Sequence, residues 1–169
     1  MKKLFFAAVA VFAFGMTNAQ MKKGDLMLEA NTDFGEAVGN TSFSFNSKDG
    51  ASSYNLGVEG GYFVMDDLAV KVGLGFGGVT PKEGDGTTAL GYKIGAKYYV
   101  LSMIPVEVSY NGTSSKASDN PSYVGLQGGY AIMLNDNVSL EPGIRYNNSL
   151  DTEKFKSFLQ FNVGFALHF

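Results

Sequence analysis

The sequence predicts an all-β fold in which eight antiparallel strands, connected up and down, close into a β-barrel. Three observations support this prediction. Apolar residues recur at every second position in eight segments, the connections between the segments alternate between long and short, and glycine is concentrated in the polar phase. A period of two residues is typical of a strand with two unlike faces. A chain of 169 residues has the length of one domain.

The clearest strand is the last one, within residues 154–169. Counted backwards in steps of two from Phe169, every residue as far as Leu159 is apolar, and the intervening residues are mostly small or polar. Seven earlier segments show the same alternation. They cover residues 25–34, 54–63, 68–77, 89–99, 104–110, 123–133 and 138–147. No charged residue stands in the apolar phase of any of the eight segments.

Two stretches depart from this regular pattern. Residues 35–53 contain a short alternating run and a turn signal at Lys48-Asp49-Gly50, and two interpretations remain open for them. They form either a small hairpin outside the barrel or an extension of the neighbouring strands. Pro142 lies inside a predicted strand and has no N–H to donate, which predicts a bulge or a local water there.

The lengths of the connections favour a barrel that spans a membrane. In an up-and-down sheet of eight strands, the short turns lie at one end together with both termini, and the long loops lie at the other end. Short turns opposite long loops, and strands of about 9–11 residues, are typical of outer-membrane barrels. The predicted architecture is therefore an eight-stranded antiparallel transmembrane β-barrel over residues 20–169.

A soluble lipocalin-like barrel also alternates, with its apolar face inward. Two features favour the opposite orientation. Tyrosines in the apolar phase form two bands near the strand ends. Tyrosine is enriched at the two interfaces between a bilayer and water, so two such bands are typical of a membrane barrel. These are Tyr54, Tyr110 and Tyr146 near the long loops, and Tyr62, Tyr98 and Tyr130 near the short turns. Glycines alternating with long polar residues also suit the narrow lumen of an eight-stranded barrel.

The polar phase predicts a charged network inside the lumen. Its members are Glu29, Glu59, Lys71, Lys93, Lys97, Glu107, Gln127, Glu141, Arg145 and Gln160. Buried charges must be paired or wetted. Hairpin register predicts the pairs Glu59–Lys71 and Lys97–Glu107, and Glu141 stands two inward steps from Arg145 on one strand. We expect a salt-bridged core that closes the barrel; the alternative is a narrow path for ions or small solutes.

Residues 1–19 resemble a secretory signal peptide. Lys2 and Lys3 precede an apolar core at residues 4–14, and small residues flank a cleavage point after Ala19. The chain has no cysteine and a net charge of −3, and removal of the two lysines makes it more acidic. Nothing in the composition indicates nucleic-acid binding, and no cofactor, metal or catalytic residues are predicted.

An enzyme is not expected. The only histidine is His168, beside the C-terminus, and no inward serine is expected beside it at the same depth, so a catalytic triad is hard to assemble. The run Gly73-Leu74-Gly75-Phe76-Gly77-Gly78 fits a dinucleotide fingerprint by its letters, but no helix pattern follows it. A lipid-modifying enzyme of the outer membrane is the third and least favoured function.

The whole mature chain resembles the small bacterial outer-membrane barrels of the OmpA-transmembrane-domain and OmpX type. The amphipathic strands, the aromatic bands and the terminal Phe165, Leu167 and Phe169 carry this resemblance. It implies an outer-membrane location with both termini in the periplasm, contact with outer-membrane lipids and lipopolysaccharide, and insertion by the barrel-assembly machinery, which reads such a C-terminal strand. The implied function is non-enzymatic: loops presented outside the cell for surface interaction or adhesion with an extracellular partner, and envelope integrity.

Overall fold

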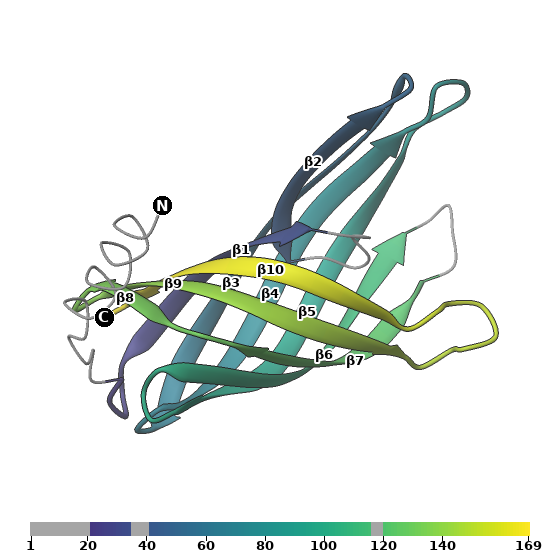
Figure 1. Cartoon of the computed structure of the whole chain (residues 1–169). Coiled ribbons are helices and arrows are strands. Elements are labelled where there is room, and N and C mark those ends of the chain that lie inside the picture. Colours follow the sequence, from purple (N-terminus) through teal and green to yellow (C-terminus); the bar gives the residue numbers. More distant parts are fainter. Residues whose placement is uncertain (1–20, 35–40, 116–119) are drawn as a thin grey trace, which may run out of the picture.

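The structure, a computed structural model, describes residues 21–34, 41–115 and 120–169. The predicted signal peptide lies outside the described residues. All described strands join one sheet, which closes because β10 pairs with both β1 and β9 (Figure 1). The strands are β1 Leu26–Phe34, β2 Ser42–Lys48, β3 Ala51–Met65, β4 Leu68–Thr80, β5 Thr87–Val100, β6 Ile104–Ser115, β7 Ser122–Gly129, β8 Ile132–Asn135, β9 Val138–Ser149 and β10 Phe158–His168.

The described ring contains nine strand positions, so the expected number of eight was wrong. β7 and β8 share one position, since both pair with β9. The extra strand is β2, which runs antiparallel to β3 and touches β1 in parallel at Ser42 and Phe43. Deeper in the barrel β1 pairs with β3 directly. Residues 42–53 therefore extend the wall, as one of the two interpretations predicted.

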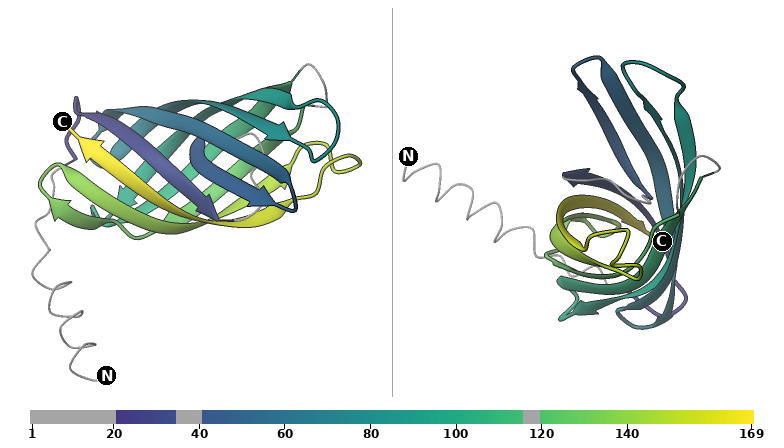
Figure 2. Two further views of the ribbon diagram at one scale, coloured as in Figure 1. Left: turned by 90° about the horizontal axis from the view of Figure 1, so that it is seen from above. Right: turned by 90° about the vertical axis from the view of Figure 1, so that its right-hand side faces the viewer.

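Several hairpins continue past their expected ends. The turn between β2 and β3 has two residues, Asp49 and Gly50, both with positive φ (53° and 87°), which suits the tight hairpin turn that Asp-Gly favours. β3 has 15 residues, β4 has 13 and β5 has 14. Together β2 to β5 reach beyond the remaining strands at the long-loop end (Figure 1), and they stand away from β9 and β10 in the end-on view (Figure 2, right).

No register shift occurs at Pro142, so the predicted bulge there was wrong. Pro142 is paired in regular register with Val163 of β10. The consequence of the missing N–H lies on the other side, where β7 and β8 are interrupted at Tyr130 and Ala131. Tyr130 donates its N–H to the Pro142 carbonyl at 3.0 Å, but proline has no N–H with which to complete the pair of bonds.

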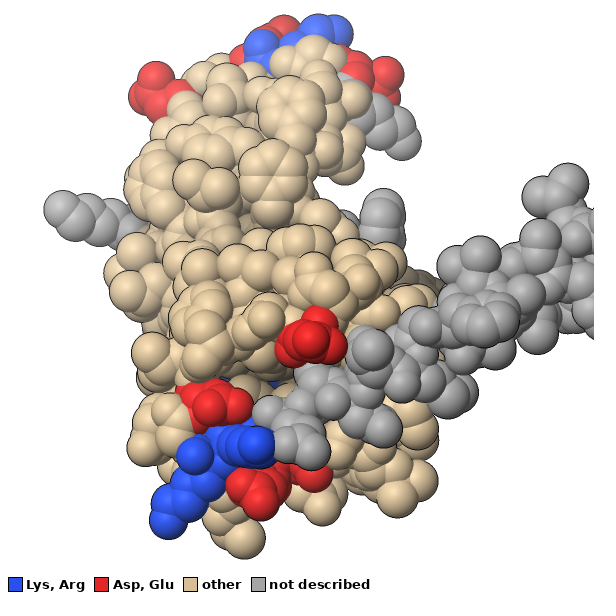
Figure 3. Space-filling model, turned by 90° about the vertical axis from the view of Figure 1, so that its left-hand side faces the viewer, with Lys and Arg blue, Asp and Glu red and all other residues tan. Residues whose placement is uncertain are grey.

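The apolar phase faces outward on every strand, which excludes the lipocalin-like arrangement. On β4, the outward side chain of Leu74 is 63 % exposed, whereas Lys71, on the opposite face of the same strand, is 1 % exposed. A view onto the short-turn end shows charged atoms at the rim and at distant hairpin tips, and a wall without charged groups between them (Figure 3). No described segment is a helix long and apolar enough to cross a membrane.

Candidate functional site

The centre of the lumen is occupied by ion pairs, and Lys71 of β4 is their hub. Its Nζ lies 2.7 Å from Oε2 of Glu29, 2.8 Å from Oε2 of Glu59 and 2.7 Å from Oε2 of Glu107. These three carboxylates come from β1, β3 and β6. The side chain of Lys71 therefore crosses the barrel and joins walls that are not neighbours, and it includes the predicted Glu59–Lys71 pair.

A second lysine, Lys97 of β5, extends the network toward the short turns. Its Nζ lies 2.8 Å from Oε2 of Glu29, and it also forms an ion pair with Glu141 of β9. The predicted pair of Lys97 with Glu107 does not form, although the two residues are opposite each other in the ladder. Inward side chains point into the middle of the barrel, where a carboxylate from across the lumen lies closer than the neighbour on the same wall.

Arg145 of β9 ends the network on the side of the long loops. Its guanidinium lies 3.0 Å from Oε1 of Glu107 and donates to the amide oxygens of Asn147 at 2.9 Å, Asn111 at 3.0 Å and Gln127 at 3.3 Å. The predicted contact of Glu141 with Arg145 does not form, because each of them bonds across the lumen instead. Glu141 accepts hydrogen bonds at 2.9 Å and 2.8 Å from hydroxyl groups at the short-turn side.

The central layer balances its charges. Four glutamates, Glu29, Glu59, Glu107 and Glu141, face Lys71, Lys93, Lys97 and Arg145. Lys93 lies 2.5 Å from Oε1 of Glu59. Ion pairing offsets the large cost of removing each charge from water, and the loss of one member leaves the others buried and unpaired. The predicted network residues are thus brought together, with Gln127 beside Arg145 and Gln160 accepting a hydrogen bond from Asn147 at 3.1 Å.

An apolar layer lies below the charges, at the short-turn end of the lumen. Phe63, Tyr99 and His168 pack against one another with ring centroids 6.0–6.2 Å apart. A cluster of buried apolar residues surrounds them: Met21, Met27, Ala69, Ala131, Met133 and Ala166. Sequence reasoning missed this plug, although the inward positions of Phe63 and Tyr99 were visible in the alternation of their strands.

The expectation that no serine stands beside His168 was wrong. Ser139 of β9 places its Oγ 3.1 Å from Nε2 of His168 and donates to Oε1 of Glu141 at 2.8 Å. All three side chains are buried. The carboxylate contacts the serine and not the imidazole, and Nδ1 of His168 has no hydrogen-bond partner. These hydrogen bonds link the apolar plug to the charged layer. Their order differs from that of a catalytic triad, in which the carboxylate contacts the histidine and the histidine contacts the serine.

A third layer, toward the long loops, is polar and uncharged in the described side chains. It contains Asn31, Ser42, Asn162 and Gln160, each with a buried polar atom that has no hydrogen-bond partner. Such atoms are usually satisfied by water or a ligand. From one end to the other, the lumen is therefore apolar, then ionic, then neutral and polar. Among the described residues, no group of three or more His, Cys, Asp or Glu side chains is placed to hold a metal.

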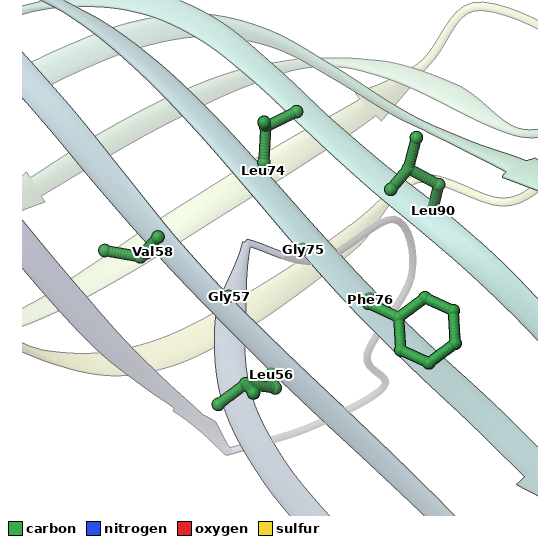
Figure 4. A pocket seen from close by; sticks show the side chains of 7 residues that line it. All are labelled: Leu56, Gly57, Val58, Leu74, Gly75, Phe76 and Leu90. Atoms are coloured by element: carbon green, nitrogen blue, oxygen red, sulfur yellow. The ribbon is translucent and has the colours of Figure 1, made fainter.

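The predicted aromatic positions lie on the outer surface. Tyr54, Tyr62, Tyr98, Tyr110, Tyr130 and Tyr146 are all exposed. In the C-terminal strand, Phe165 and Phe169 are exposed and Leu167 is half-buried. A shallow apolar depression lies on the same outer wall, between the outward side chains of Leu56, Val58, Leu74, Phe76 and Leu90 (Figure 4). Its lining continues the apolar wall and contains no polar side chain.

Comparisons with known proteins support this fold. The outer-membrane protein Ail of Yersinia pestis in a phospholipid nanodisc is similar with a TM-score of 0.53 and 11 % identity, over 87 % of this chain and 100 % of that chain. A de novo designed transmembrane β-barrel is similar with a TM-score of 0.50 and 15 % identity, over 89 % and 99 %. No family model and no curated protein matches. The chain thus has the fold of a small outer-membrane β-barrel, as the resemblance predicted.

Proposed function

We propose that the protein is a non-conducting, non-enzymatic barrel of the bacterial outer membrane that anchors projecting hairpins at the cell surface for interaction or adhesion, and that supports envelope integrity. The observation that carries this proposal is the buried ionic layer, in which Lys71 contacts three carboxylates from three strands. The exposed apolar wall supports a membrane location. The short turns and the C-terminus then face the periplasm, and the barrel-assembly machinery inserts the chain through its last strand.

Electrical recording of the refolded protein in a planar bilayer tests whether the lumen is closed. We expect no stepwise current in neutral salt, because the ionic layer and the plug both lie across the path. Reproducible stepwise openings by the wild-type protein would reject the closed core and favour a narrow channel for ions or small solutes. Heat-modifiable migration on a gel shows in the same sample that the barrel has folded.

The projecting sheet of β2 to β5 supports a role at the cell surface. Phe43 and Phe45 on β2 are exposed there and extend the aromatic residues around Tyr54. Replacing residues 45–54 by a two-residue Asn-Gly turn between the ladder partners Ser44 and Asn55 should leave membrane insertion intact and reduce adherence of expressing cells to protein-coated surfaces. Equal adherence with and without this hairpin would contradict the proposal. Mass spectra of lipid A that change on expression would indicate a lipid-modifying enzyme instead.

A further inference from the structure

A large exposed apolar side chain lies in or beside each of the three short turns. Met65 is the last residue of β3 and is 61 % exposed, Leu101 lies between β5 and β6 and is 75 % exposed, and Leu134 lies in β8 and is 56 % exposed. They lie past the tyrosine band that ends the apolar wall. Exposed apolar groups that gather at one edge of a molecule commonly mark an interaction surface.

The backbone at these three positions is irregular. Leu101 has a φ of 54°, in the left-handed region where asparagine and glycine are favoured and a branched apolar side chain is rare. The ladder shifts register between Phe63 and Met65, and again between Met133 and Asn135 around Leu134. Bulges of this kind re-aim side chains. A leucine that is both strained and exposed does not stabilise its own turn, so its side chain serves something outside the described barrel.

The position of the rim along the barrel axis and the charge of the rim favour a protein partner over the membrane surface. Leu101 lies three residues beyond Tyr98, roughly 7–8 Å along the barrel axis for a tilted strand. The headgroup region is about 5–7 Å deep on each side, so the turn extends to its outer edge or past it. Asp25, Asp66, Asp67 and Asp136 stand at the same rim together with two lysines, Lys22 and Lys23, and the Lys23 N–H donates to Oδ1 of Asp66 at 2.8 Å. The acids outnumber the lysines, so the rim is net acidic, which disfavours contact with the phosphates of lipid headgroups.

We propose that Met65, Leu101 and Leu134 form a docking rim for a soluble protein whose apolar groove is bordered by lysine or arginine. The acids of the rim complement such a border, and the three apolar side chains enter the groove. The inference that this partner is a periplasmic protein rests on the proposed function. The apolar and charged groups that the partner must offer follow from the described rim alone.

A single tryptophan tests whether the rim is free of lipid. The chain contains no tryptophan, so Leu101→Trp and Leu74→Trp each introduce one probe. In nanodiscs that contain brominated phosphatidylcholine, we expect strong quenching of the probe at position 74 and weak quenching at position 101. Equal quenching at both positions would place the rim in the membrane. That result would overturn the docking proposal but not the membrane location of the barrel. Lack of quenching at position 74 would instead contradict the membrane location of the barrel.

Photo-crosslinking in the bacterium that produces the protein tests for the partner. A photoreactive benzoylphenylalanine at Asn135 should give one discrete adduct with a periplasmic protein. Met65→Ser combined with Leu101→Asn should lower its yield about tenfold, as expected for the central apolar contacts of an interface. Asp66→Asn combined with Asp67→Asn should lower it as well, and the adduct should weaken at high salt.

Ser102→Asn is the matched control, because Ser102 also has a positive φ, of 56°, and its replacement relaxes the same turn without removing an apolar group. Both Leu101→Asn and Ser102→Asn should raise the urea midpoint of unfolding, but only Leu101→Asn should reduce the adduct. No adduct, an adduct indifferent to the apolar substitutions or to salt, or a lower urea midpoint for Leu101→Asn would each overturn the proposal.

Discussion

At the scale of single residues, the inward glycines are explained by what stands opposite them. A Cβ at position 125 would lie 2.0 Å from Nη2 and 2.5 Å from Cζ of Arg145, so the guanidinium lies directly on the Gly125 backbone. A Cβ at Gly73 would lie 3.0 Å from Cγ of Glu59. Glycine thus provides the space in which long charged side chains of other strands cross a narrow lumen.

Gly125→Ala is predicted to displace Arg145 and weaken its bonds to Glu107 and Asn111. Steric crowding and imperfectly paired polar groups should lower the free energy of unfolding by about 1–3 kcal/mol. Urea unfolding in lipid vesicles, followed by tyrosine fluorescence, measures this change. Gly128→Ala is the control, since a Cβ there meets no atom within 4 Å. Equal loss of stability in both variants would contradict the role given to Arg145.

At the scale of elements, the break between β7 and β8 follows from the missing N–H of Pro142. Pro142→Val is predicted to complete the pair of bonds with Tyr130 and to join the two strands. One added backbone hydrogen bond should raise the free energy of unfolding by about 1 kcal/mol. Slower amide hydrogen exchange at Tyr130 and at its neighbours in the sheet measures the repair. Unchanged exchange at Tyr130 would show that another feature interrupts the strand.

The entry of β2 into the wall depends on another glycine. Thr41 precedes β2, is buried, and donates its hydroxyl to Glu59. A Cβ at Gly57 would lie 2.2 Å from the carbonyl carbon of Thr41, so the chain enters the lumen directly against β3. This placement lets a ninth strand join a ring whose deeper half has eight, because β1 leaves β3 at this level.

Gly57→Ala is therefore predicted to push the start of β2 away from β3. The amides of residues 42–48 should exchange hydrogen at least about tenfold faster, since their ladder loses its anchor at Thr41. Gly60→Ala on the same strand is the control, because a Cβ there meets no atom within 4 Å. If β2 exchanges at the wild-type rate in Gly57→Ala, the contact with Thr41 does not hold this strand.

At the scale of the whole molecule, the plug and the ionic layer are two barriers in series. Lys71→Met leaves three carboxylates with less compensation and should cost about 3–5 kcal/mol in unfolding free energy. Phe63→Ala opens the plug. Each variant alone is predicted to remain without stepwise current in a planar bilayer, whereas the double variant should conduct cations. Full conductance in either single variant would show that one layer alone closes the lumen.

The alternation by itself determined the strand segments and the set of charges that share one face of the sheet, because a period of two residues assigns every side chain to a face. The two tyrosine bands and the inward glycines then indicated that the apolar face meets the membrane. The period of two put Glu29, Lys71 and Arg145 on one face, and these two signals assigned that face to the lumen. Tertiary structure decided which charges meet, since Lys97 bonds across the lumen to Glu141 and not to Glu107, its neighbour in the ladder. It also decided the ninth strand and the contact of Ser139 with His168, because both depend on the relative height of segments far apart in the chain, which no local pattern encodes.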